Sequence, residues 1–215
     1  MLLSQRLQTI IAEYDLLKHP MYQAWTAGEL SLDVLKRYAA QYYAYVAYFP
    51  RFISRVHAEC PEIAARKVLL ENLVDEEIHG KDHPALWMQF AKGLGLTRAA
   101  VLQERLLPET KAMIEDYCDL AAGDWRDGLC ALYAYESQVP AVSASKIAGL
   151  KKFYGMTDEE ALAFFTAHQI YDVEHSAQVA KLVDEYADPM SAEKAVRRAS
   201  SALWKFLDGM QAVCV

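Results

Sequence analysis

Three side chains that can bind a metal share one face of a predicted helix in the last third of the chain. They are His168, Asp172 and His175, and the helix is expected over residues 157–186. Positions i, i+4 and i+7 lie within roughly 60° of one another, because each helical residue turns the chain by about 100°. Apolar residues cover much of the rest of this helix, so it is expected to be mostly buried, and its ionisable groups then need partners. This pattern favours a metal site over a solvated helical face.

Further carboxylates and histidines must come from other helices if this face binds metal. Glu136 lies among apolar and aromatic neighbours, where an unpaired carboxylate is costly; a core arginine or lysine partner is the alternative. The segment 71–84 contains Glu76, His79 and His83. Glu76 could pair with His79, as in a ferritin-like di-iron bundle, or with His83 beyond the intervening glycine. Spacing does not decide between these two pairings.

Either pairing gives a donor set of three carboxylates and three imidazoles. Two divalent ions would bring a charge of +4 against −3 from the carboxylates, which leaves room for a bridging hydroxide. Imidazole and carboxylate donors with few or no thiolates suit iron or manganese better than a structural zinc site. The sequence therefore predicts two metal ions, as Fe/Fe or Fe/Mn.

Helical periodicity and capping residues predict the elements that position these groups. We expect helices over residues 2–18, from 31 onward with a kink at Pro50, 61–80, 84–92, from 97 with an interruption at Pro108, 124–150, 157–186 and 189–209. Residues 21–28 are expected to connect the first two helices. Sustained period-two alternation, flexible linkers and internal repeats are not found. The sequence thus predicts an all-α bundle of about seven helices in one domain spanning residues 1–215.

Composition and charge narrow the classes of partner. A net charge of −7 argues against binding to a nucleic-acid backbone or an anionic membrane surface. No apolar run approaches the roughly 20 residues that cross a bilayer, and the N-terminal residues lack the pattern of a signal peptide. The four cysteines are far apart and form no C-x-x-C pair: Cys60, Cys118, Cys130 and Cys214. We therefore expect a reduced, cytoplasmic protein.

The order of the candidate ligands resembles that of the haem-oxygenase-like dimetal oxidases. That order is Glu76, His83, Glu136, His168, Asp172 and His175. Within this superfamily the chain is most similar to the CADD-like proteins, named after the Chlamydia protein associating with death domains, and to their bacterial relatives. The similarity includes HPMYQAW at 19–25 and the 72–87 segment. It implies a haem-oxygenase-like fold, and it implies that His83 rather than His79 is the ligand.

The resemblance also implies an unusual reaction. CADD-like proteins are implicated in making para-aminobenzoate for folate biosynthesis, with a tyrosine of the protein itself as the source of the ring and a lysine as the proposed source of nitrogen. The matching positions are Tyr22 and Lys146. Tyr38 and Tyr135 are expected to relay electrons or to position the released ring, whereas Phe164 stands where relatives use a further tyrosine. The residues alone favour a packing tyrosine at position 22 and an ordinary helix lysine at position 146, so these two roles rest on the resemblance.

The resulting expectation is a self-sacrificing dimetal oxidase that uses O2 and an external reductant. We expect a homodimer, with no nucleic acid, no membrane and no substrate other than O2 and reductant. The alternatives are a dimetal oxidase of the same superfamily acting on an external amino acid or fatty acid, a ferritin-like iron protein, and an interaction protein. Metal stoichiometry and the mass of the chain after reaction distinguish these classes.

Overall fold

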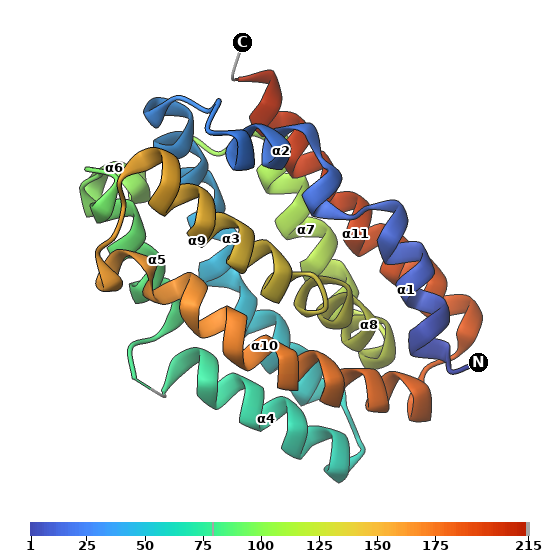
Figure 1. The fold of residues 1–215 in the computed structure, drawn as a ribbon. Coiled ribbons are helices and arrows are strands. Elements are labelled where there is room, and N and C mark those ends of the chain that lie inside the picture. The colour runs from blue at the N-terminus through green and yellow to red at the C-terminus, as the bar shows by residue number, and fades with distance from the viewer. Residues whose placement is uncertain (79, 214–215) are drawn as a thin grey trace.

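The computed structural model of the protein describes residues 1–78 and 80–213 (Figure 1). Among these residues it contains eleven α-helices, one 3-10 helix and no strand. The helices are α1 (Leu3–Glu13), η1 (Leu16–Lys18), α2 (Pro20–Ala27), α3 (Leu32–Glu59), α4 (Ile63–Glu77), α5 (His83–Gly93), α6 (Arg98–Gln103), α7 (Pro108–Ala122), α8 (Trp125–Glu136), α9 (Val139–Tyr154), α10 (Glu159–Tyr186) and α11 (Pro189–Ala212). The predicted all-α class is confirmed. The expected count of about seven helices was low because several predicted segments are divided.

Tyr22 lies on a short helix, not in the expected connection. Pro20 is the first residue of α2, and the ring nitrogen Nδ1 of His19 accepts a hydrogen bond from the backbone N–H of Met21. Proline is favoured at this position because its missing N–H would have no partner in the first turn. We had interpreted Pro20 only as the end of the preceding helix. Gly28, with φ of 73°, ends α2.

The predicted helix over 124–150 is two helices. It breaks at residues 137–138, and α9 begins with Val139 and Pro140, as expected for a proline that cannot continue a helix from the preceding turn. The last helix, in contrast, runs past Gly209 to Ala212. A Cβ on Gly209 would lie 2.8 Å from Cβ of Glu109, so this glycine permits close packing of α11 on α7 and does not terminate the helix.

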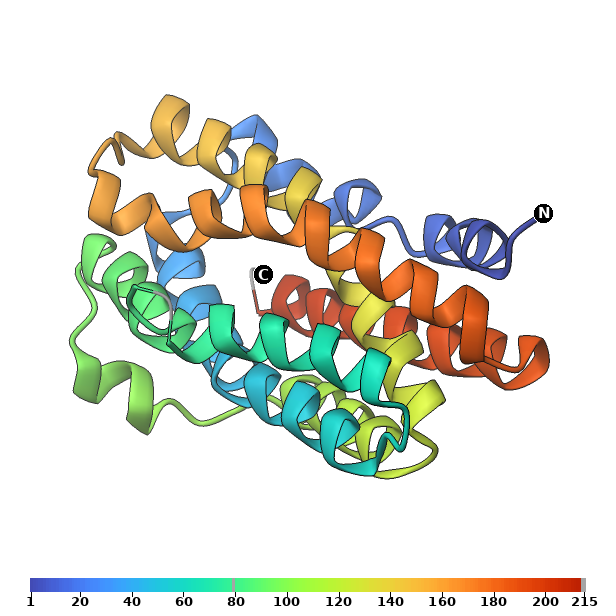
Figure 2. The same cartoon turned by 90° about the horizontal axis from the view of Figure 1, so that it is seen from below.

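The helix α3 runs through the interior of the bundle, with α4, α5, α7 and α8 packed against it. Helix α10 packs on α5, α8, α9 and α4, and Figures 1 and 2 both show it alongside α4 and α9. Helix α11 packs against α1, α7 and α8. The ligand-bearing helices α4, α5, α8 and α10 are therefore neighbours, although they are distant in sequence.

One face of α3 carries a row of buried aromatic rings at helical spacing. Their positions follow steps of four and three residues, which keeps them on one side of the helix: Tyr38, Tyr42, Tyr45, Phe49 and Phe52. They belong to one apolar core cluster that extends from Leu7 in α1 to Met210 in α11. None of the helices in the described residues is both long enough and apolar enough to cross a membrane.

Candidate metal centre and tyrosine cluster

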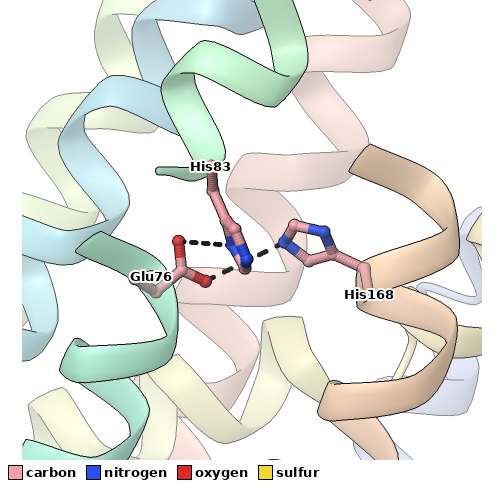
Figure 3. Close-up of side chains that lie close together, drawn as sticks. All are labelled: Glu76, His83 and His168. Atoms are coloured by element: carbon pink, nitrogen blue, oxygen red, sulfur yellow. Dashed lines mark ion pairs between the residues drawn. The ribbon is translucent and has the colours of Figure 1, made fainter. Parts of the chain in front are cut away.

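Three of the predicted ligands converge in the interior. Glu76 comes from α4, His83 from the first turn of α5 and His168 from the middle of α10, and Figure 3 shows their side chains pointing toward one another. Nδ1 of His83 lies 2.8 Å from Oε2 of Glu76, and Nε2 of His168 lies 3.9 Å from Oε1 of Glu76. One donor atom from each residue lies within 4.8 Å of the others, and all three residues are buried. We call them the first ligand group.

His83 is held in this position by the start of α5. The carboxylate of Asp82 caps the helix by accepting a hydrogen bond from the backbone N–H of Ala85, and Pro84 follows His83 in the first turn. The structure thus brings to Glu76 the histidine that the resemblance indicated. His79 lies outside the described residues, so its predicted alternative pairing stays a prediction.

The other three predicted ligands form a second ligand group beside the first: Glu136 at the end of α8, and Asp172 and His175 on α10. Nδ1 of His175 lies 3.7 Å from Oδ1 of Asp172. Among the described residues, Oε2 of Glu136, Oδ2 of Asp172 and Nδ1 of His175 are buried atoms without a hydrogen-bond partner. Such atoms are costly in a protein interior unless something else binds them.

Two histidines of the site have their donor atoms fixed by hydrogen bonds. Nδ1 of His168 lies 2.8 Å from the backbone carbonyl oxygen of Phe164. Because a carbonyl oxygen can only accept a hydrogen bond, Nδ1 carries the proton, and the unprotonated Nε2 is the nitrogen that can bind a metal. Nε2 of His175 lies 2.9 Å from Oδ2 of Asp75, which by the same argument leaves Nδ1 facing Asp172. A hydrogen bond on the far nitrogen is how metal-binding histidines are usually oriented.

Burial and mutual repulsion perturb the pKa values of the second ligand group. Burial, with repulsion from Asp172, raises the pKa of Glu136 to about 8. Burial, with Glu76 nearby, raises the pKa of Asp172 to about 6. For His175, burial alone lowers the pKa, but the surrounding carboxylates outweigh it and raise the value to about 9. Shifts in this direction are expected for buried carboxylates that lie close enough to repel one another.

The donor set fits an iron or manganese centre. Within the described part of the chain, no lysine or arginine forms an ion pair with Glu76, Glu136 or Asp172. Glu136 instead accepts a hydrogen bond from the amide of Asn72. The proposed core cation partner of Glu136 is therefore not found. Nδ1 of His83 lies close to the carboxylate of Glu76 but is not aligned to donate a hydrogen bond to it. Two side chains that bind the same metal ion have this arrangement, because both direct their lone pairs at the ion. Nitrogen and oxygen donors without a thiolate suit Fe or Mn.

Tyr22, Tyr38 and Lys146 form a buried cluster on α2, α3 and α9. The hydroxyls of Tyr22 and Tyr38 are 2.8 Å apart, and Nζ of Lys146 donates a hydrogen bond of 2.6 Å to the hydroxyl of Tyr38. Both the Tyr22 phenol and the Lys146 amine therefore contact the same oxygen. The predicted tyrosine and lysine are thus brought together, with Tyr38 between them.

The amine of Lys146 is enclosed by aromatic rings. Its Nζ lies 4.7–5.6 Å from the centres of the rings of Tyr22, Tyr38, Tyr42, Trp25 and Phe165. Burial lowers the pKa of Lys146 well below its ordinary value, because removal from water disfavours the charged form. Burial therefore favours the neutral, nucleophilic form of the amine.

Tyr42 is a residue of this cluster that the sequence argument did not single out. Its ring stacks on that of Tyr38, with centres 5.5 Å apart, and its hydroxyl donates a 3.2 Å hydrogen bond to the hydroxyl of Tyr135. Tyr135 precedes Glu136 on α8, and the charges of the nearby ligand carboxylates act on it. Tyr42 thus links the Tyr22 cluster to the ligand groups. Its four-residue spacing from Tyr38, which places both rings on one face of a helix, was the available signal in the sequence.

Phe164 occupies the place beside the ligands where relatives were expected to have a tyrosine. Its ring centre is 4.0 Å from that of His168 and 4.7 Å from that of Trp87. Trp87 in turn contacts Tyr42, with ring centres 5.1 Å apart. The ring of Phe164 therefore contributes packing between the ligands and the aromatic core, but it offers no hydroxyl.

Comparison with known proteins agrees with this arrangement. The sequence profile of a family described as iron-containing redox enzymes matches residues 36–206, a span that contains all six predicted ligands. The chain belongs to this family. The protein is therefore an oxidoreductase, and the family's iron agrees with the nitrogen and oxygen donors of the two ligand groups.

Two relatives in the family have the same name. The chain is 41% identical over 220 residues to the 4-aminobenzoate synthase of Nitrosomonas europaea, covering 96% of this chain and 89% of that protein. It is 35% identical over 206 residues to the 4-aminobenzoate synthase of Chlamydia muridarum, covering 94% and 87%. The resemblance to CADD-like para-aminobenzoate synthases is confirmed.

Solved structures confirm the fold of this family member. A CADD-like protein of unknown function from Nostoc punctiforme superimposes with a TM-score of 0.80 at 18% identity, covering 99% of this chain and 97% of that one. A domain of unknown function with a haem-oxygenase-like fold from Shewanella denitrificans superimposes with a TM-score of 0.81 at 18% identity, covering 97% and 90%. At this identity the likeness shows the fold alone.

Proposed function

We propose that the protein makes 4-aminobenzoate, for folate biosynthesis, from the side chain of its own Tyr22, with Lys146 as the source of the amine nitrogen. The relatives named 4-aminobenzoate synthase support the product. The observation that carries the assignment to these residues is the cluster itself, in which the Lys146 amine lies 4.7 Å from the centre of the Tyr22 ring and both contact the hydroxyl of Tyr38.

The six ligands would hold two metal ions, as Fe/Fe or Fe/Mn. Glu76, His83 and His168 supply one set of donor atoms, and Glu136, Asp172 and His175 supply the other. When bound, the metals supply oxidation by O2, with electrons from an external reductant. The protein's own contribution is to keep water away from the ring that reacts, because Tyr22, Tyr38 and Lys146 are each at most 5% exposed.

The ring carbons, the carboxyl carbon and the nitrogen of the product are present in the cluster. The Cα–Cβ bond of Tyr22 breaks and Cβ is oxidised to the carboxyl carbon, with O2 as the oxidant and as a source of the carboxyl oxygens. Two-electron oxidation of the ring lets Nζ of Lys146 condense with the carbon that bears the phenolic oxygen, which leaves as water; hydrolysis then breaks the Cε–Nζ bond and leaves Cε of Lys146 as an aldehyde. The carbon that must accept nitrogen carries the hydroxyl that contacts Tyr38, and the amine contacts the same Tyr38 oxygen. Tyr38 therefore positions the nitrogen against the reacting end of the ring.

Protonation states support the roles. Burial raises the pKa of Tyr22 above its ordinary value, so the phenol remains protonated and must pass its proton to a neighbour when the ring is oxidised. Tyr38 is in hydrogen-bond contact with this phenol and with the amine of Lys146, so it can relay the proton by passing its own hydroxyl proton to the amine, which gives the proton up again before it attacks. Burial lowers the pKa of Lys146 well below its ordinary value, which favours the neutral amine whose lone pair can attack.

Isotope labelling tests the proposal directly. Protein is produced with carbon-13 in the rings of tyrosine and nitrogen-15 in the side chain of lysine, loaded with Fe(II) or with Fe(II) and Mn(II), and exposed to O2 and reductant. We expect 4-aminobenzoate that contains both labels, in an amount that does not exceed one molecule per chain. Peptide mapping should find the chain altered at Tyr22 and at Lys146.

Matched variants and an unlabelled reaction complete the test. Tyr22→Phe should retain the metals and lose the product, whereas Tyr43→Phe, which removes a half-buried phenol of α3 outside the cluster, should not change the yield. The proposal would be overturned if unlabelled product formed from an added amino acid or other substrate while the polypeptide itself stayed chemically unaltered. That result would favour an oxidase acting on an external substrate.

We further propose that the protein works in the cytoplasm as a homodimer. The described cysteines Cys60, Cys118 and Cys130 are free thiols, which supports a reducing compartment; Cys214 lies outside the described residues. Ile170 and Val173 of α10 and Ile78 at the end of α4 are large apolar residues more than half exposed, which supports a contact with a second copy. Light scattering coupled to size-exclusion chromatography tests the dimer, and a monomer at micromolar concentration would contradict it.

A further inference from the structure

We propose that Asn72 and Asp75 of α4 are positioning residues for the second ligand group, and that this group binds its metal ion after the first group has bound one. The inference rests on the proposed dimetal centre. Positions 72, 75 and 76 of α4 are related by i, i+3 and i+4, so their side chains share one face of the helix. Glu76 is a ligand of the first group. The other two side chains on that face reach ligands of the second group.

Asn72 holds Glu136. Its Nδ2 donates a 2.6 Å hydrogen bond to Oε1 of Glu136, and both residues are buried. This bond occupies one carboxylate oxygen and leaves Oε2 without a hydrogen-bond partner among the described residues. The amide thus determines which oxygen of Glu136 remains available to a metal.

Asp75 holds His175. Oδ2 of Asp75 accepts a 2.9 Å hydrogen bond from Nε2 of His175, which turns Nδ1 toward Asp172 at 3.7 Å. A pocket of about 390 Å³ between α4 and α10 has both Asp75 and His175 in its wall. The second ligand group therefore lies next to solvent through this pair, whereas the residues of the first group do not line the pocket.

The two groups differ in how far they are assembled before metal binds. The metal-binding atoms of the first group already lie within 4.8 Å of one another. Among the described residues, the second group does not meet this distance. In the second group, the carboxylate of Glu136 and the ring of His175 are held by neighbours on α4 and not by each other. An ion entering the second group must therefore draw together ligands from α8 and α10, which weakens its binding relative to the first ion.

Metal titration tests this order without any measurement of product. Metal-free protein is titrated with Co(II), followed by absorption and by equilibrium dialysis with elemental analysis. For the wild type we expect two ions per chain with unequal affinities. Asp75→Ala and Asn72→Ala should each weaken binding of the second ion by roughly 10- to 100-fold and leave the affinity for the first ion unchanged. Asp75→Asn, whose side-chain oxygen can still accept from Nε2, should restore part of the loss.

The controls separate a positioning role from a general loss of structure. Glu71→Ala removes an acidic side chain from the same pocket and helix and should not change either affinity. His83→Ala should abolish binding of the first ion, and circular dichroism reports whether each variant is folded. Two ions bound by Asp75→Ala with wild-type affinities would overturn the proposal. An equal loss of affinity for the first and the second ion in the folded Asp75→Asn and Asn72→Ala variants would also overturn it. Neither result would bear on whether Tyr22 is the source of the product.

Discussion

The amine of Lys146 lies 4.7 Å from the centre of the Tyr22 ring, and the hydroxyl of Tyr38 accepts a hydrogen bond from it at 2.6 Å. Lys146 is only 5% exposed, and this burial lowers its pKa. A lysine in this position destabilises the fold whenever it is protonated. The proposed role as amine donor, which needs a neutral amine beside this ring, would account for a lysine inside an aromatic core.

Replacing Lys146 by methionine should flatten the dependence of stability on pH. The folded-state pKa of Lys146 lies well below the ordinary value of 10.5. Between these two values the unfolded chain binds a proton that the folded chain does not, so the free energy of unfolding of the wild type increases with pH. Metal-free Lys146→Met should be more stable than the wild type toward lower pH, and the difference should shrink by about 1.4 kcal/mol per pH unit as the pH rises through this window.

Chemical denaturation of both proteins at a series of pH values measures this difference. The ligand groups titrate alike in the two proteins and cancel in the comparison. Parallel stability profiles would show that Lys146 remains charged in the folded protein.

Metal binding should release protons and strengthen with pH. The carboxylates around His175 outweigh its burial and raise its pKa to about 9, and burial with repulsion from Asp172 raises the pKa of Glu136 to about 8. Both groups hold a proton at neutral pH in the metal-free protein, and both must lose it to act as ligands, so loading should release about two protons per chain. Calorimetry in buffers of different ionisation enthalpy counts them. Glu136→Gln should lower the count by one, and an unchanged heat across buffers would contradict the prediction.

The sequence predicted most helices but not all of their ends, for reasons that particular prolines and glycines illustrate. Helix starts at Ser31 and Thr97 were evident because short polar side chains cap the first turn. The sequence alone does not identify Pro20 and Pro140 as helix starts, because a proline can follow the end of one helix or occupy the first turn of the next. A glycine near the end of a helical pattern predicts a helix end at Gly209, but this residue instead permits close packing against Glu109, which depends on a tertiary contact.

The candidate site was predictable where ionisable residues stand in apolar helices. His168, Asp172 and Glu136 were conspicuous for this reason, and the structure buries them together. Asn72 and Asp75 were not singled out, because an acid-rich helix end is usually solvated and only the fold places this one beside α8 and α10. The i, i+3, i+4 relation of both residues to Glu76 was the available signal.

Gly149 should be required for the packing of Trp25 over the Lys146 amine. A Cβ at Gly149 would lie 2.8 Å from Cδ1 and 3.3 Å from the backbone oxygen of Trp25, so Gly149→Ala must move α2 away from α9. We expect a loss of about 1–3 kcal/mol in the free energy of unfolding, together with slower formation of product while the protein is still folded, because Tyr22 shares α2 with Trp25. Thermal unfolding and single-turnover product analysis measure the two effects.

The neighbouring Ala148→Ser is the matched control for this change. Ala148 is exposed, so the added oxygen meets solvent and stability should change by less than about 0.5 kcal/mol. If Gly149→Ala matched this control in both measurements, the contact between α2 and α9 would not govern the geometry of the cluster.

Tyr42→Phe should slow formation of product without loss of metal. The hydroxyl of Tyr42 donates to that of Tyr135, beside the ligand groups, and its ring stacks on Tyr38, so it completes a row of oxidisable phenols through which an electron can pass from Tyr22. Removing the hydroxyl breaks this row and costs about 1 kcal/mol of stability for the lost hydrogen bond. We expect slower product formation, because phenylalanine cannot be oxidised as the phenol can and the electron must take another route.

Tyr45→Phe distinguishes this role from a general need for buried phenols. Tyr45 is fully buried on the same face of α3, and its hydroxyl has no well-aligned hydrogen-bond partner among the described residues. The same atom is removed from the same helix in both variants, so packing losses are alike, and only Tyr42→Phe interrupts the contact with Tyr135. Rapid-quench measurement of 4-aminobenzoate in metal-loaded samples compares them. Equal rates in the two variants would show that the hydroxyl of Tyr42 does not connect the ligand groups to Tyr22, and transfer would then have to pass through Trp87, whose ring contacts both Tyr38 and Phe164.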